Sequence, residues 1–122
     1  MDKKRIMVAD DEEDFLKAME IRLQGAGYDV VLVRDGEDLK KECEQEIPDL
    51  VVLDVMMPKM NGFEVLRWMK NHEKLKEIPV IYLTAGAFDI SQELDILSQA
   101  HDFMLKTVDS DKIIERIEKI FG

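Results

Sequence analysis

The chain has 122 residues, 46% of them hydrophobic, a net charge of −10 at pH 7, two histidines and one cysteine. This length is typical of one domain, and the apolar content is too high for a disordered protein. One cysteine excludes an internal disulfide, and two histidines with one cysteine are too few for the usual four-ligand zinc site. The negative charge disfavours direct binding to nucleic acid.

The same sequence argues against a membrane protein. No apolar run approaches the roughly 18 residues that a membrane span requires. The first residues, MDKKRIMVADDEED, lack the long apolar stretch of a signal peptide. We therefore expect a soluble, cytoplasmic protein without a membrane contact.

Five short apolar runs indicate strands: 6–9, 30–33, 50–53, 80–83 and 103–105. The runs at 50–53 and 80–83 are continuous and contain several β-branched residues, which is typical of strands buried on both faces. Between these runs, and after the last of them, apolar residues recur at the spacing of an amphipathic helix. The stripes are Phe15/Leu16/Met19/Leu23, Leu39/Cys43, Phe63/Leu66/Met69, Ile90/Leu94/Leu97 and Ile113/Ile114/Ile117/Phe121.

The alternation of strand and helix five times predicts the fold. Such units form a parallel sheet with right-handed crossovers and helices on both faces. We predict a single α/β domain over residues 1–122, a doubly wound, flavodoxin-like (βα)5 fold with strand order 2-1-3-4-5. In that order a crevice opens at the carboxyl ends of the first and third strands, where a functional site is expected.

Acidic residues follow the two strands that would flank this crevice. Asp10 and Asp11 follow the first strand, and the third strand ends in Asp54. Three carboxylates this close repel one another and bind protons more tightly unless a cation neutralises them, and Mg²⁺ is a hard cation that prefers such oxygen ligands. The acidic run also suits the first turn of a helix, where negative charge is stabilising, so this explanation stays open.

The remaining strand ends favour a chemical role. The fourth strand ends in Thr84 and the fifth in Lys106, which adds a hydroxyl and an ammonium group to the same edge. Mg²⁺ and Lys106 would balance the three carboxylates. A phosphoryl group on Asp54 would add negative charge that Thr84 and nearby backbone N–H groups are suited to bind. The set is thus similar to a phosphoryl-transfer site.

These residues carry a resemblance to a known family. The segment VVLDVMMPKMNGFE (51–64), the early acidic pair, Thr84-Ala85 and Lys106 resemble the receiver domain of two-component response regulators. The resemblance covers essentially the whole chain. It implies that Asp54 accepts a phosphoryl group from a sensor histidine kinase or a histidine phosphotransfer protein.

The resemblance also assigns roles to individual residues. Asp11, Asp54 and the main-chain carbonyl of Met56 would bind Mg²⁺, with Asp10 acting through water. Thr84 and Lys106 would contact the phosphoryl oxygens. Phe103 stands where the family has an aromatic residue whose rotation accompanies activation.

The chain departs from the family pattern at Thr107, where a proline in a cis peptide is usual after the lysine. Met56 and Gly86 occupy two positions that tune the lifetime of the phosphoryl group. Because neither offers a carboxylate or amide to orient a hydrolytic water, we predict slow self-dephosphorylation, over minutes or longer.

The expected function is a phosphorylation-controlled signalling switch that is not an enzyme in the ordinary sense. Its output would be a changed surface across the fourth helix, fifth strand and fifth helix that controls a partner or an output domain. The chain would be a monomer or a phosphorylation-linked dimer.

Three other functions fit the sequence less well. A haloacid-dehalogenase-like phosphatase needs a second acid where this chain has Met56. A flavin- or nucleotide-binding module needs a phosphate-binding loop where this chain has DDEED. A receiver-like interaction domain that is never phosphorylated usually lacks the acceptor, an acid or the lysine, all of which are present here.

Overall fold

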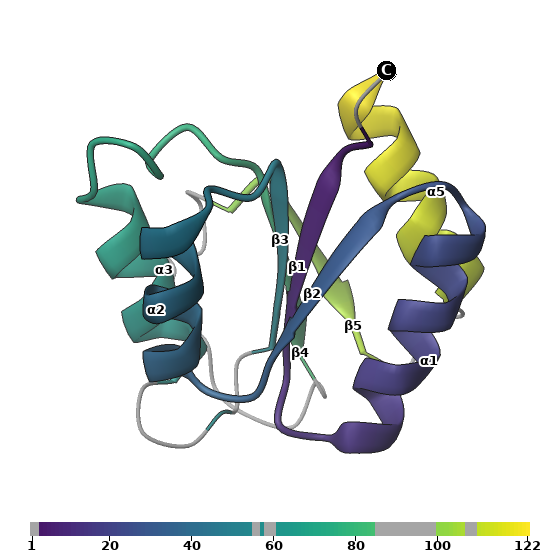
Figure 1. Ribbon diagram of the computed structural model, residues 1–122, viewed down its shortest axis with the longest axis horizontal. Coiled ribbons are helices and arrows are strands. Elements are labelled where there is room, and N and C mark those ends of the chain that lie inside the picture. Colours follow the sequence, from purple (N-terminus) through teal and green to yellow (C-terminus); the bar gives the residue numbers. More distant parts are fainter. Residues whose placement is uncertain (1–2, 55–56, 58–60, 85–99, 107–109) are drawn as a thin grey trace.

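The computed structural model describes residues 3–54, 57, 61–84, 100–106 and 110–122 (Figure 1). The predicted fourth helix, with Ile90, Leu94 and Leu97, lies outside these residues. Within them, no helix has the length and apolar character needed to cross a membrane.

Five parallel strands form one sheet in the order β2-β1-β3-β4-β5, which confirms the predicted topology. The register places Met7 of β1 beside both Val31 and Val51. β3 is buried along its whole length because it lies between β1 and β4, which explains its continuous apolar sequence. The strands are β1 (Arg5–Ala9), β2 (Asp29–Val33), β3 (Leu50–Asp54), β4 (Val80–Thr84) and β5 (Asp102–Leu105).

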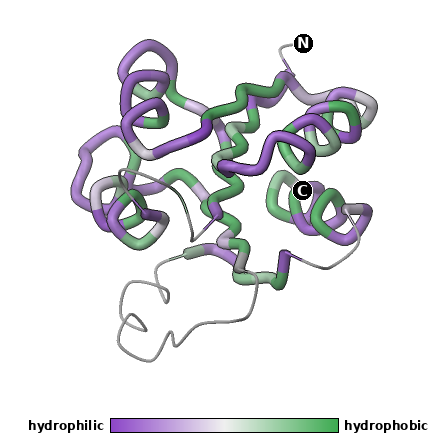
Figure 2. Tube along the Cα trace, turned by 90° about the horizontal axis from the view of Figure 1, so that it is seen from below, coloured by the Kyte–Doolittle hydropathy of each residue, from purple (hydrophilic) through white to green (hydrophobic). Residues whose placement is uncertain are grey.

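Helices cover both faces of the sheet. One face carries α1 and α5, and the other carries α2 and α3 (Figure 1). Figure 2 shows the strands, largely apolar, between these two helical layers. The bounds are α1 (Glu13–Gly25), α2 (Gly36–Gln45), α3 (Gly62–Lys70) and α5 (Ser110–Phe121).

The sheet divides the buried side chains into two clusters. Along β1, Met7 and Ala9 face the α2–α3 layer, whereas Ile6 and Val8 face the α1–α5 layer. This alternation follows from the two-residue period of a strand.

Side-chain caps begin two of the helices. Asn61 Oδ1 accepts a hydrogen bond from the Glu64 N–H at 3.0 Å, and Asp35 Oδ1 accepts one from the Asp38 N–H at 2.9 Å. These bonds satisfy N–H groups in the first turns of α3 and α2. α1 ends before Gly27, whose φ of 97° suits glycine at a helix C-terminus.

Candidate functional site

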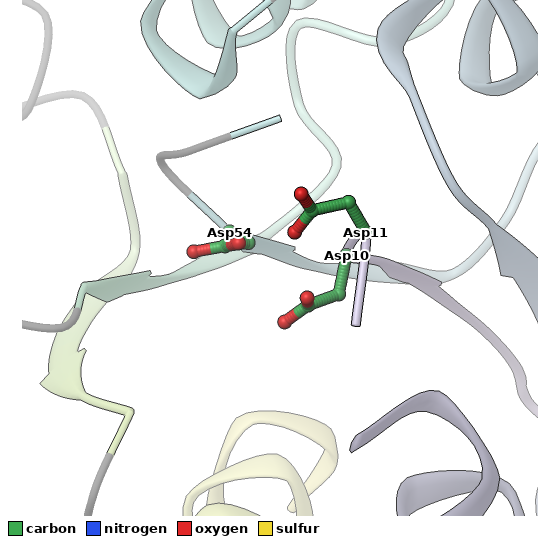
Figure 3. A group of neighbouring side chains, drawn as sticks. All are labelled: Asp10, Asp11 and Asp54. Atoms are coloured by element: carbon green, nitrogen blue, oxygen red, sulfur yellow. The ribbon is translucent and has the colours of Figure 1, made fainter. Parts of the chain in front are cut away.

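The acidic residues meet at the carboxyl edge of the sheet because β1 and β3 are neighbours. Ala9 pairs with Leu53, so Asp10 and Asp54 leave the two strands side by side. One carboxylate oxygen from each of Asp10, Asp11 and Asp54 lies within 4.8 Å of the others. Figure 3 shows the three carboxyl groups around the ends of these strands.

Burial differs among the three carboxyl groups. Asp10 is fully buried, Asp54 is 4% exposed and Asp11 is exposed. Burial raises the pKa of Asp10 above its ordinary value, and hydrogen bonds from Lys106 and from the Glu12 N–H offset part of that effect. Carboxylate oxygens this close to one another, two of them on buried residues, fit a hard divalent cation such as Mg²⁺.

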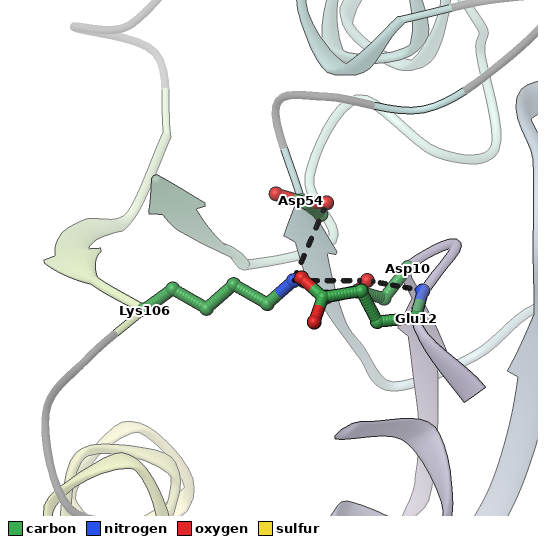
Figure 4. Close-up of polar contacts among 4 residues, drawn as sticks. All are labelled: Asp10, Glu12, Asp54 and Lys106. Atoms are coloured by element: carbon green, nitrogen blue, oxygen red, sulfur yellow. Dashed lines mark hydrogen bonds and ion pairs between the residues drawn. The ribbon is translucent and has the colours of Figure 1, made fainter. Parts of the chain in front are cut away.

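Lys106 extends from the end of β5 into the acidic cluster (Figure 4). Its Nζ lies 2.8 Å from Asp10 Oδ2 and 3.7 Å from Asp54 Oδ2, and its side chain is only 12% exposed. Burial of the ammonium acts against its charge, but the hydrogen bonds to Asp10 and Glu12 outweigh burial and raise the pKa of Lys106 to about 12. Lys106 is therefore positively charged at neutral pH.

Two contacts of Lys106 were missed by the sequence reasoning. The Glu12 carboxylate accepts a hydrogen bond from Nζ, and the ring of Phe15 lies 4.9 Å from Nζ in cation–π geometry. Glu12 is the N-cap of α1, and Phe15 lies in its first turn. The acidic run and the apolar stripe indicated only structural roles for them, and the one signal of a further role is that both closely follow Asp10 and Asp11 in the chain.

The α1 start also explains how Asp10 is held. Glu12 occupies the N-cap position of α1 without a capping hydrogen bond from its side chain. Its backbone N–H instead donates to Asp10 Oδ1 at 2.8 Å. Asp10 is thus fixed by the turn that starts the helix, while Glu13 and Asp14 of the same acidic run lie in the first turn of α1.

The other predicted site residues are placed in part. Thr84 is the last residue of β4 and is paired with Leu105, next to Lys106. Phe103 lies on β5 and is 41% exposed. Met56, Gly86 and Thr107 lie outside the described residues, and so does the peptide bond that precedes Thr107.

This arrangement combines a buried carboxylate at the end of a central strand, a cluster of oxygen ligands suited to a cation and a fixed ammonium group. A carboxylate nucleophile beside a divalent cation and a lysine can accept a phosphoryl group, because both cations neutralise the phosphoryl oxygens.

Comparisons with known proteins agree with the fold. The alkaline phosphatase synthesis transcriptional regulatory protein PhoP of Bacillus subtilis is 36% identical to this chain. The match covers 96% of this chain and 48% of PhoP. The polar-differentiation response regulator DivK of Brucella ovis is 29% identical to this chain, and the match covers 98% of this chain and 97% of DivK. This chain thus spans about half the length of PhoP and nearly all of DivK.

Solved structures point the same way. The BeF3-activated N-terminal receiver domain of RstA from Klebsiella pneumoniae has a TM-score of 0.82 and 25% identity, covering 94% of this chain and 96% of that one. The family model described as "Response regulator receiver domain" matches residues 6–118. This protein therefore belongs to the response regulator receiver domain family.

Proposed function

We propose that the chain is a signalling switch in which Asp54 accepts a phosphoryl group in a Mg²⁺-dependent reaction. The observation that supports this proposal most directly is the position of the Asp54 carboxylate, within 4.8 Å of Asp10 and Asp11 and 3.7 Å from Lys106 Nζ. The donor would be a phosphohistidine on a sensor histidine kinase or a histidine phosphotransfer protein.

The metal site of this proposal uses the acidic cluster. Asp11, Asp54 and the main-chain carbonyl of Met56 would hold Mg²⁺, and Asp10 would act through water. When bound, the cation neutralises the carboxylates and the oxygens of the incoming phosphoryl group. Asp10 remains between the metal site and Lys106, with which it forms the 2.8 Å ion pair.

The transfer forms one bond and breaks another. A carboxylate oxygen of Asp54 attacks phosphorus and forms a P–O bond while the P–N bond to the donor histidine breaks. The bonding electron pair remains on the imidazole nitrogen, and the product is an acyl phosphate on Asp54. Lys106 and the Thr84 hydroxyl would bind the phosphoryl oxygens.

The output of the switch is proposed to be a change of surface. β5 exposes two large apolar side chains, Phe103 at 41% and Leu105 at 48%, and α5 packs next to it. Together with the fourth helix, this surface would contact a partner protein, an output domain or a second copy of the chain. The protein takes part in its own phosphorylation but turns over no metabolite.

Intact-mass spectrometry tests the proposal. The protein is incubated with Mg²⁺ and acetyl phosphate, in parallel with Asp54→Asn, an EDTA control and Asp14→Asn as a matched loss of one exposed acid. We expect a gain of about 80 Da, the mass of one phosphoryl group, in the wild type and Asp14→Asn only. After the donor is removed, the adduct should persist for minutes or longer, because neither Met56 nor Gly86 has a side-chain carboxylate or amide that could orient a hydrolytic water.

Three outcomes would contradict the proposal. An adduct that survives in Asp54→Asn would place the acceptor elsewhere. Absence of both the adduct and Mg²⁺ binding would favour an interaction domain that is never phosphorylated, and steady release of phosphate from phosphomonoesters would indicate a phosphatase.

A further inference from the structure

Glu12 is an exposed residue that reaches a nearly buried lysine. The Glu12 side chain is 65% exposed, whereas the side chain of Lys106 is 12% exposed. Their carboxylate and ammonium groups form an ion pair and a hydrogen bond at the mouth of the acidic cluster (Figure 4).

Lys106 is held by Asp10 and Glu12 rather than by Asp54. Its ammonium group donates hydrogen bonds to Asp10 Oδ1 at 3.1 Å and to Glu12. Asp10 Oδ2 adds an ion-pair contact at 2.8 Å. Asp54 Oδ2, at 3.7 Å, is beyond hydrogen-bond distance.

A phosphoryl group on Asp54 would therefore compete for the same ammonium. Asp10 is fully buried, so losing its hydrogen bond to Lys106 would leave a desolvated carboxylate without its cation. Glu12 is hydrated over most of its surface, and its carboxylate can return to water at little cost. Glu12 is thus the partner that yields when Lys106 turns to the phosphoryl oxygens.

We infer that Glu12 is a positioning residue that holds Lys106 in the unphosphorylated state and so lowers the affinity of the site for a phosphoryl group. Its charge adds a second effect. By formal count, the carboxylates of Asp10, Asp11, Asp54 and Glu12 exceed the charges of Lys106 and a bound Mg²⁺ by one, so the site is still negative when the phosphoryl group arrives. This inference rests on the proposed function of Asp54.

Binding of beryllofluoride tests the inference without group transfer, because BeF3⁻ is a non-covalent mimic of a phosphoryl group. Titration calorimetry in Mg²⁺ compares the wild type with Glu12→Gln. We expect Glu12→Gln to bind BeF3⁻ about two- to fivefold more tightly, the range given by an ion pair with one exposed partner.

Glu13→Gln is the matched control, since it removes the same charge one residue further along. Glu13 is exposed and pairs with Arg34 and Lys17, not with Lys106. Its BeF3⁻ affinity should equal that of the wild type. In Mg²⁺-free protein, the ¹⁵N resonance of the Lys106 ammonium should shift in Glu12→Gln and stay unchanged in Glu13→Gln.

The outcomes separate this inference from the proposed function. A wild type that binds Mg²⁺ but not BeF3⁻ would overturn the proposed function and, with it, the role of Glu12. If the wild type binds BeF3⁻ and Glu12→Gln binds equally or more weakly, only the inference about Glu12 fails. A large loss of Mg²⁺ affinity in Glu12→Gln would likewise overturn it, because Glu12 would then act on the metal.

Discussion

At the scale of single residues, Lys106 is held by groups from distant parts of the chain. Asp10 and Glu12 come from the turn before α1, whereas Lys106 follows β5. Since Asp10 is fully buried, the ammonium group is what makes its negative charge tolerable in the absence of a metal. The Asp10–Lys106 ion pair therefore stabilises the fold and is also part of the candidate site.

Lys106→Met should destabilise the metal-free protein by about 3 kcal/mol, because breaking a buried ion pair leaves an uncompensated charge. Urea unfolding in EDTA measures the change, and Lys112→Met, a substitution at an exposed position of α5, should alter stability by less than about 0.5 kcal/mol. Equal effects of the two substitutions would show that Asp10 does not depend on Lys106.

Cys43 gives a prediction for alkaline pH. Burial raises the pKa of the Cys43 thiol to about 11 from an ordinary value of 9.0. The unfolded chain therefore loses this proton first, and the stability contributed by Cys43 is present below pH 9 and declines as the pH rises toward 11.

Urea unfolding at several pH values from 8 to 11 checks this prediction by comparison with Cys43→Ala. The stability difference in favour of the wild type should narrow as the pH rises. A constant difference would mean that the thiol ionises equally in the folded and unfolded states.

At the scale of secondary-structure elements, the apolar pattern predicted the strands well because every one of them is buried on at least one face. The predicted runs 50–53 and 80–83 lie inside β3 and β4, and the stripe from Phe15 to Leu23 lies inside α1. The polar ends Asp54 and Thr84 belong to β3 and β4 through backbone pairing, as predicted, although the apolar runs alone stop one residue earlier.

The site was predictable only as far as topology determines it. The strand order brings Asp10 and Asp54 together, since parallel strands share a carboxyl edge. The contacts of Glu12 and Phe15 with Lys106 depend instead on the path of the turn between β1 and α1. Hydrophobic periodicity contains no information on that path.

The side-chain cap at the start of α3 gives a prediction for this helix. Its side chain accepts the Glu64 N–H at the start of α3, so Asn61→Ala should reduce the free energy of unfolding by about 1 kcal/mol. Asn61→Asp, which keeps the accepting oxygen, should retain nearly wild-type stability in the same urea titration. A loss of similar size in both variants would show that the amide group, not the cap, is what matters.

At the scale of the whole molecule, the carboxylate cluster couples ligand binding to stability. A cation that binds only the folded chain stabilises it by mass action. With Mg²⁺ about tenfold above its dissociation constant, the melting temperature should rise by roughly 3–6 °C for a chain of this size.

Thermal unfolding with Mg²⁺ or EDTA measures this shift in two variants. Asp11→Asn should abolish it, because Asp11 contributes one of the three clustered carboxylates. Asp14→Asn, an equal loss of charge at an exposed position outside the cluster, should preserve it. An undiminished shift in Asp11→Asn would place the cation elsewhere.

The division of the core by the sheet has a consequence for how substitutions combine. Leu66 belongs to the cluster under α2 and α3, and Leu16 to the cluster under α1 and α5. Because the sheet separates these side chains, destabilising changes at the two positions should be nearly additive, whereas pairs within one cluster should show epistasis. Substitutions can therefore accumulate in one helical layer without changing the packing of the other. Both layers share the sheet edge that holds Asp10 and Asp54.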